Sequence, residues 1–137
     1  MLKRTLLIIV TVTIFVLVSI SCAEDEPPPV NTSVGGVVLE TGLAVDENMV
    51  ITDPVINFKS NEEFYFYFHN NEPFNAEWVV VQLIESKSDR ILAGNEYPVE
   101  PEASSITDMI WFGGTGKYKI VIYVAGQIRA TREVIIE

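Results

Sequence analysis

The side chains that could perform nucleophilic or acid–base chemistry are few. The chain has one histidine, His69, and one cysteine, Cys22. A Ser, Thr or Cys nucleophile needs a neighbouring general base, usually a histidine that a carboxylate orients. His69 ends an aromatic run and precedes a polar, proline-containing turn, so we expect it at a strand edge or in a loop. We therefore predict that the chain is not an enzyme and has neither catalytic residues nor a cofactor.

Carboxylates offer the remaining chemistry, because the chain has 19 Asp and Glu residues. No spacing among them singles out a general acid and a general base, although a small hydrolase that uses paired carboxylates remains an alternative. Asp46, Glu47 and Asp53 supply hard oxygen ligands within one loop and are weak Ca²⁺ candidates. They lack the regular spacing and the glycine of an EF-hand. A calcium-stabilised adhesin-like domain is thus the second alternative, and otherwise we predict no metal.

The charge balance excludes one class of partner. Nine basic and 19 acidic residues give a net charge of −10. Binding to nucleic acid depends on clustered Lys and Arg that neutralise phosphates. We therefore predict no nucleic-acid partner.

The N-terminus has the pattern of a secretory signal. Lys3 and Arg4 precede an apolar stretch over residues 6–18, and small residues then lead to Cys22. We expect residues 1–21 to be removed. Because they carry two basic residues and no acid, the mature chain would hold seven basic and 19 acidic residues, a net charge of −12.

The segment Val18-Ser19-Ile20-Ser21-Cys22 resembles a bacterial lipobox, with Ser19 where that family usually has Leu. The resemblance implies a bacterial lipoprotein in which the cysteine receives diacylglycerol and fatty acids such as palmitate and becomes the mature N-terminus. Two or three acyl chains anchor a protein stably to a membrane. The alternative is an uncleaved single-pass inner-membrane helix over residues 5–21, which is near the lower length limit for crossing a bilayer. Both place the following domain outside the cytoplasm.

Residues 22–33 have the composition of a disordered tether. Three acids are followed by three prolines and a short polar stretch, which cannot form a core and favour extended, solvated chain. Ala23 follows the cysteine where inner-membrane lipoproteins of Gram-negative bacteria carry Asp, so the lipobox resemblance implies the outer membrane. We therefore divide the chain into a signal peptide (1–21), a tether (22–33) and a domain (34–137).

The domain has the alternating pattern of an all-β protein. Short apolar runs with a period of two are separated by turn residues, and no segment sustains a helical repeat. Seven or eight strands at this spacing are typical of an antiparallel β-sandwich. The clearest predicted strands are 63–69, 77–85, 106–112, 117–124 and 127–136, and the weaker ones are 36–40, 50–51 with 55–58, 90–93 and 97–99.

Gly116, Tyr118 and Ile120 resemble the Gly-x-Tyr-x-Cys start of the sixth strand in immunoglobulin-like domains, with Ile120 in place of the cysteine. The resemblance implies an immunoglobulin-like sandwich with a tyrosine corner, in which the buried tyrosine donates its hydroxyl to backbone in a loop. It also suggests Trp78 as the buried tryptophan of the third strand.

The residues that could contact a partner are aromatic. Aromatic side chains bury a large area at low entropic cost. The candidates are Tyr65, Tyr67, Phe74, Trp111 and Phe112. Core or rim packing is the alternative role for each of them, and Phe74 in particular could close one end of the sandwich. We also expect Arg129, Arg132 and Glu133 to guard the last strand as a free sheet edge. Taken together, the sequence predicts a lipid-anchored, extracytoplasmic binding or structural module of the bacterial cell envelope, whose partners are the membrane and an envelope component.

Overall fold

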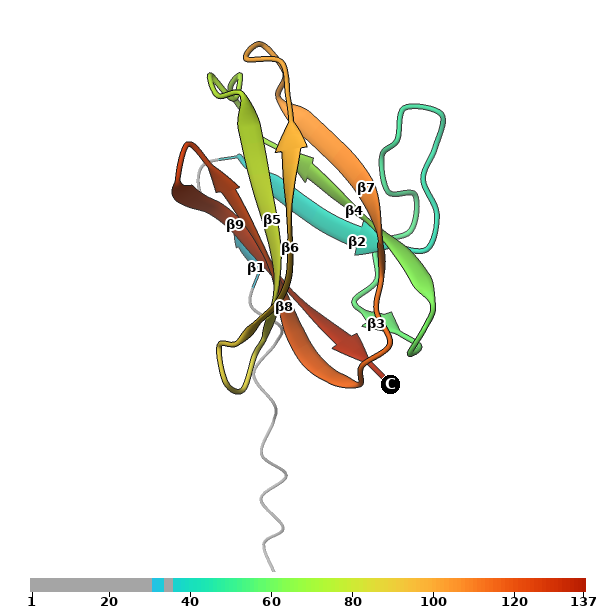
Figure 1. Ribbon diagram of the computed structural model, residues 1–137. Helices are drawn as coiled ribbons and strands as arrows, with labels where there is room; N and C mark the ends of the chain where they lie inside the picture. Colours follow the sequence, from blue (N-terminus) through green and yellow to red (C-terminus); the bar gives the residue numbers. More distant parts are fainter. Residues whose placement is uncertain (1–30, 34–35) are drawn as a thin grey trace, which may run out of the picture.

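The computed structural model describes residues 31–33 and 36–137, and the signal segment, Cys22 and most of the predicted tether lie outside this part of the chain. The described residues form nine strands, shown in Figure 1. These are β1 (Asn31–Ser33), β2 (Val38–Gly42), β3 (Asn57–Phe58), β4 (Glu63–His69), β5 (Trp78–Glu85), β6 (Ile91–Pro98), β7 (Ser105–Trp111), β8 (Gly116–Val124) and β9 (Gln127–Ile136). In this described part of the chain, no helix is long and apolar enough to cross a membrane.

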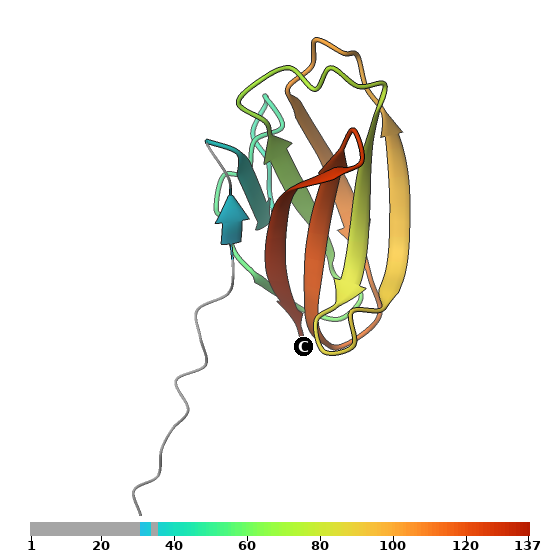
Figure 2. The same ribbon diagram turned by 90° about the vertical axis from the view of Figure 1, so that its left-hand side faces the viewer.

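The strands form two sheets that face one another. One sheet has the order β1-β9-β8-β5-β6, with β3 pairing in parallel with the end of β9, and the other has the order β2-β4-β7. Figure 2 shows the larger sheet in front of the smaller one. The chain changes sheet at every connection except those between β5 and β6 and between β8 and β9. This confirms the predicted all-β, immunoglobulin-like sandwich.

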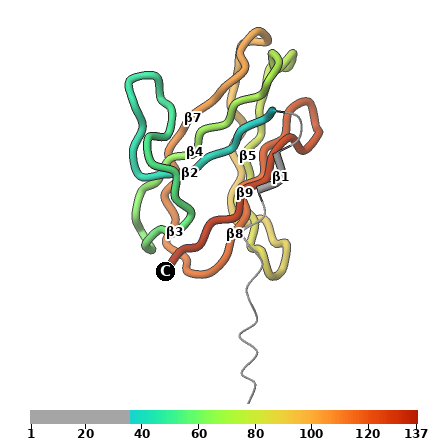
Figure 3. Tube along the Cα trace, turned by 180° about the vertical axis from the view of Figure 1, so that it is seen from behind, coloured from blue at the N-terminus to red at the C-terminus, as the bar shows by residue number. Residues whose placement is uncertain are grey.

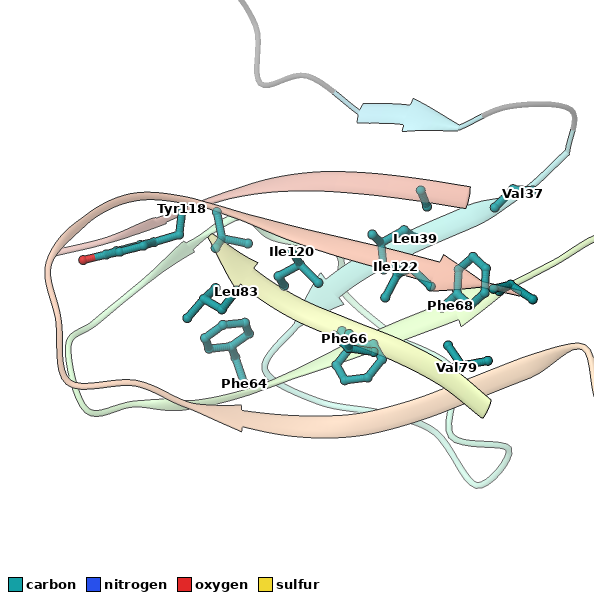
Figure 4. Close-up of a cluster of buried hydrophobic side chains, with 14 of the residues drawn as sticks. Val37, Leu39, Phe64, Phe66, Phe68, Val79, Leu83, Tyr118, Ile120 and Ile122 are labelled. Atoms are coloured by element: carbon teal, nitrogen blue, oxygen red, sulfur yellow. The ribbon is translucent and has the colours of Figure 1, made fainter. Parts of the chain in front are cut away.

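Alternating side chains build the core between the sheets. Phe64, Phe66 and Phe68 of β4 point inward and are almost fully buried. They face Val79 and Leu83 of β5 and Ile120 and Ile122 of β8, as Figure 4 shows. The period of two in both strands therefore sets which side chains leave water, and burial of this apolar surface is the main force that holds the layers together.

The tyrosine corner forms as the resemblance implied. Tyr118 is 4% exposed, and its hydroxyl donates a hydrogen bond to the Thr115 carbonyl at 2.7 Å. Its ring meets the edge of the Phe112 ring with centroids 5.0 Å apart. Ile120, in the position of the missing cysteine, is fully buried, so apolar packing joins the sheets at this point.

Three expectations about the strands are wrong. Trp78 is 50% exposed, because β5 points Val79 and not Trp78 toward the core. The last strand is not a free edge, since β1 and β3 pair with the side of β9 that faces away from β8. The predicted tether ends before Asn31, because Asn31–Ser33 forms β1 and pairs with Ala130, Thr131 and Arg132.

Candidate functional site

A groove opens between the edge strands of the two sheets on one side of the sandwich. β6 is the last strand of the larger sheet and β7 is the last strand of the smaller one. The groove between them has a volume of about 130 Å³. It is lined by residues of β5, β6 and β7 and by the residue after β7, namely Val81, Leu83, Ala93, Gly94, Asn95, Tyr97, Met109, Ile110, Trp111 and Phe112. Its apolar lining and exposed position are the properties of a binding surface.

Two of the predicted contact aromatics lie in this groove. Trp111 ends β7 and is 63% exposed, the largest exposed fraction among the exposed apolar side chains of the described domain. Phe112 follows it and is half-buried, because it packs against the core and the Tyr118 ring. Exposed tryptophan is costly to leave in water and is typical of interface hot spots. Because Trp111 pairs with Glu63 on the outward-facing side of β4, its ring projects from the outer face of the smaller sheet, and Trp111 forms the rim of the groove.

A polar cluster joins the two walls of the groove. The Asn95 amide donates a hydrogen bond of 3.4 Å to the Tyr97 hydroxyl, and that hydroxyl is also hydrogen-bonded to the Asp108 carboxylate of β7. Burial, together with the hydrogen bond and charge of Asp108, raises the pKa of Tyr97, while the Asn95 amide lowers it. The Tyr97 ring packs edge-on against Phe66, which fixes the cluster to the core.

Tyr65 and Tyr67 do not reach this groove. They lie on the outer face of β4, where both are half-buried. The long loop between β2 and β3 stands beside this face, as Figure 3 shows from behind. Thr107 of β7 donates a hydrogen bond of 2.7 Å to the Met49 carbonyl, which ties the loop to the sheet. Burial, and then the charges of Glu40 and Asp46, raise the pKa of Tyr67.

Of the two roles predicted for Phe74, the structure bears out closure of the sandwich end and contradicts partner contact. Its side chain is 4% exposed and stacks on Phe68, with ring centroids 5.9 Å apart. Its backbone N–H donates to the Ala103 carbonyl, which holds the loop before β5 against the loop after β6. Phe74 therefore closes one end of the sandwich.

The predicted calcium ligands do not converge. An Asp46 carboxylate oxygen accepts hydrogen bonds from the backbone N–H groups of Asn48 and Val50, at 2.8 and 2.9 Å. Glu47 and Asp53 are exposed on the same loop. Nowhere in residues 36–137 do three His, Cys, Asp or Glu side chains gather closely enough to hold a metal ion. Asp46 therefore caps its own loop, and it does not gather with Glu47 and Asp53 into a calcium site.

His69 is not in a loop or at a sheet edge. It ends β4, the central strand of the smaller sheet, and pairs with Val38 on one side and Ser105 on the other. Its ring stacks on Tyr67 with centroids 6.4 Å apart. This is a packing role on the outer face of the sheet.

Sequence reasoning missed the contribution of β6 to the site. Gly94 and Asn95 interrupt its apolar pattern, so residues 90–93 and 97–99 look like two short strands. One signal was available, because residues 91–116 contain four acids and no Lys, Arg or His. That stretch supplies β6, β7 and the loop between them, which together form the open side of the sandwich.

The fold and the groove define an all-β sandwich with a groove between the edge strands β6 and β7. No family model matches the chain, and no curated protein matches it. Among solved structures, it is similar to a superoxide reductase (neelaredoxin) from Ignicoccus hospitalis, with 12% identity over 78% of this chain and 82% of that one and a TM-score of 0.44. A single-residue variant of the same reductase matches with 15% identity over 62% and 77% of the two chains and a TM-score of 0.42.

This comparison corrects one prediction. The chain was expected not to be an enzyme, whereas the solved structures that it resembles are enzymes by name. The likeness is too distant to assign any activity to the chain.

Proposed function

We propose that this chain is a lipid-anchored module of the bacterial cell envelope, held to the membrane through Cys22, and that it binds an envelope partner in the groove between β6 and β7. The basic start, the apolar stretch over residues 6–18 and the position of the chain's one cysteine support the anchor. Ala23, directly after that cysteine, supports the outer membrane as its location.

The groove is the observation that carries the binding role. It combines an apolar lining, the exposed Trp111 ring and two unpaired strand edges on one side of the molecule. Exposed apolar patches with a polar rim are typical of interaction sites in proteins of this size. On the opposite side, β1 and β3 pair with β9, and β1 and β2 are the last strands of the two sheets.

The position of β1 supports an anchored module that keeps its groove accessible. β1 joins the larger sheet at the end opposite to β6. The chain thus enters the domain on the far side from the groove, so its entry point does not obstruct a partner. The net negative charge also disfavours contact between the domain and anionic lipid headgroups.

The anchor is tested by the intact mass of the N-terminal peptide of the mature protein, isolated from cells. We expect a peptide that begins at Cys22 and carries diacylglyceryl and acyl groups, and we expect Cys22→Ser to abolish both the modification and the membrane association. An unmodified cysteine in a chain that still begins at Met1 would contradict the proposal and indicate a single-pass anchor.

A further inference from the structure

The two sides of the sandwich differ in whether further strands of the chain pair with β9 on one side and with β6 and β7 on the other. On one side, β1 pairs with residues 130–132 of β9 and β3 pairs with residues 135–136, so the chain covers its own edge. On the other side, no strand in the described part of the chain pairs with the outer edge of β6 or of β7. An unpaired edge is a template on which another strand can form hydrogen bonds.

The register of β6 shows which backbone groups are free to bind. Val99 donates its N–H to the Glu77 carbonyl at 2.9 Å, which marks Glu77 and Val99 as a hydrogen-bonded pair. Because hydrogen-bonded and non-hydrogen-bonded pairs alternate along antiparallel strands, the N–H and C=O groups of Gly94 and Glu96 point away from β5. They lie at the outer edge of the sheet, ready to pair with an added strand.

Both ends of β6 are protected against pairing with another strand, whereas its middle is not. Pro98 has no N–H to offer, and a register shift beside Leu83 and Ile84 interrupts the other end of the strand. Proline and bulges are devices by which edge strands avoid pairing. Lysine, a third such device, is absent from β6. The open window is therefore residues 93–97, close to the usual length of a strand.

The groove gives an added strand a place for its side chains. Successive side chains of a strand point to opposite faces of the sheet. In a strand paired with β6, every second side chain would point between the two sheets, toward Ile110, which is an inward-facing residue of β7. In strand addition, main-chain hydrogen bonds supply affinity, and pockets for alternate side chains supply specificity.

The charge of this side sets the chemistry of the partner. Residues 91–116 carry Glu96, Glu100, Glu102 and Asp108 and no cationic side chain. Like charges repel, so the acidic edge and the net charge of the chain disfavour a second copy of itself. The complementary partner is a segment with basic residues on its outward-facing positions.

We infer that the occupant of the groove is an extended segment of another envelope protein, with alternating apolar and basic residues, that adds as a strand to the outer edge of β6. This inference rests on the proposed binding function and specifies its ligand. Its apolar side chains fill the groove between β6 and β7. Its basic side chains lie on the face of the sheet that carries Glu96.

The test uses the full chain in detergent and a blocked nine-residue peptide in which valine alternates with lysine, with affinity measured by calorimetry. We expect saturable binding by the unchanged protein. Gly94→Pro removes an outward N–H and should weaken binding at least tenfold. The matched comparison is Gly94→Ala, which keeps the N–H and whose added methyl meets no atom closer than 3.6 Å, so it should bind the peptide more tightly than Gly94→Pro does.

Two further comparisons test the inference even if the Gly94→Pro variant does not fold. A peptide with proline at alternate positions lacks the N–H groups for strand pairing and should not bind the unchanged protein. Glu96→Gln should weaken binding and reduce its dependence on salt, whereas Glu47→Gln, in the exposed loop after β2, should not.

Three outcomes overturn the inference. Binding that survives both Gly94→Pro and the proline peptide would mean a purely electrostatic attraction. Equal binding of a valine–glutamate peptide would refute the charge argument. Self-association of the chain that Gly94→Pro abolishes would make a second copy the occupant. None of these outcomes affects the mass of the Cys22 peptide, so the lipid anchor and the strand addition are tested independently.

Discussion

At the scale of single residues, the hydroxyl of Tyr118 has a specific task. It donates to the Thr115 carbonyl and thereby ties the loop before β8 to the buried ring. Tyr118→Phe removes this one hydrogen bond and keeps the packing of the ring. We expect the free energy of unfolding to fall by about 1 kcal/mol, the usual net value of a protein hydrogen bond. Urea denaturation measures the change.

The control for that change is Tyr65→Phe, which removes a hydroxyl from the half-buried outer face of β4. Substitutions on such faces usually change stability by less than about 0.5 kcal/mol. An equal loss in both variants would show that the corner hydroxyl has no special role.

Gly114 makes the same corner possible by leaving space. A methyl group on Gly114 would come within 2.8 Å of Cζ of Phe112 and of the Tyr118 hydroxyl. Overpacking of this kind costs about 1–3 kcal/mol, so Gly114→Ala should lower the midpoint of thermal unfolding by several degrees. Gly94→Ala is the matched substitution, because its methyl would make only ordinary van der Waals contacts, and it should keep the midpoint of the unchanged protein.

Single residues also show why the candidate site was only partly predictable. Trp111 and Phe112 were proposed as contact residues from their type, and the structure places both in the groove. Val81, Leu83 and Tyr97 join them from strands of the other sheet, and such contacts across the sandwich leave no spacing signal in the sequence. Phe74 has the same residue type as Phe112, but only the tertiary structure shows that it is buried.

At the scale of the elements, strands with a clear apolar alternation in the sequence were predicted with the most accurate bounds. β4 and β9 begin and end at the predicted residues. The phenylalanines of β4 alternate without interruption, and β9 starts directly after the Ala125-Gly126 turn. β6 was predicted as two pieces, since Gly94 and Asn95 break its pattern and pairing with β5 restores one strand. β1 and β3 have three and two residues, and they exist only through pairing with β9, which lies far away in sequence.

The link between β6 and β7 predicts a pH dependence. The pKa of Tyr97 is raised in the folded protein, chiefly by burial. A group of this kind keeps its proton longer in the folded state than in the unfolded one. Its contribution to stability is therefore present below the unfolded pKa of about 10 and is lost as the pH rises above it.

Two substitutions test this link with opposite signs. Tyr97→Phe should make the loss of unfolding free energy above pH 10 shallower. Asn95→Ala should make it steeper, because the Asn95 amide lowers the pKa of Tyr97. Urea denaturation at intervals from pH 8 to pH 11 measures both slopes, and identical slopes in the three proteins would refute the role of Tyr97.

At the scale of the whole molecule, the two sides of the sandwich differ in the strands that end each sheet. β1 and β3 close the side on which the chain enters, and the groove between β6 and β7 opens the other. The fold class was predictable, because it depends on composition and period. The difference between the two sides was not, because it depends on which strands pair.

The most direct test of this account is site-specific photo-crosslinking in living cells, with the photoreactive residue at position 111 in the groove or at position 128 near the start of β9. Both positions are highly exposed, at 63% and 60%. We predict one discrete crosslink to an envelope protein from position 111, none from position 128, and loss of the crosslink when Cys22→Ser releases the chain from the membrane. Equal crosslinking from both positions, or none from position 111, would contradict the account.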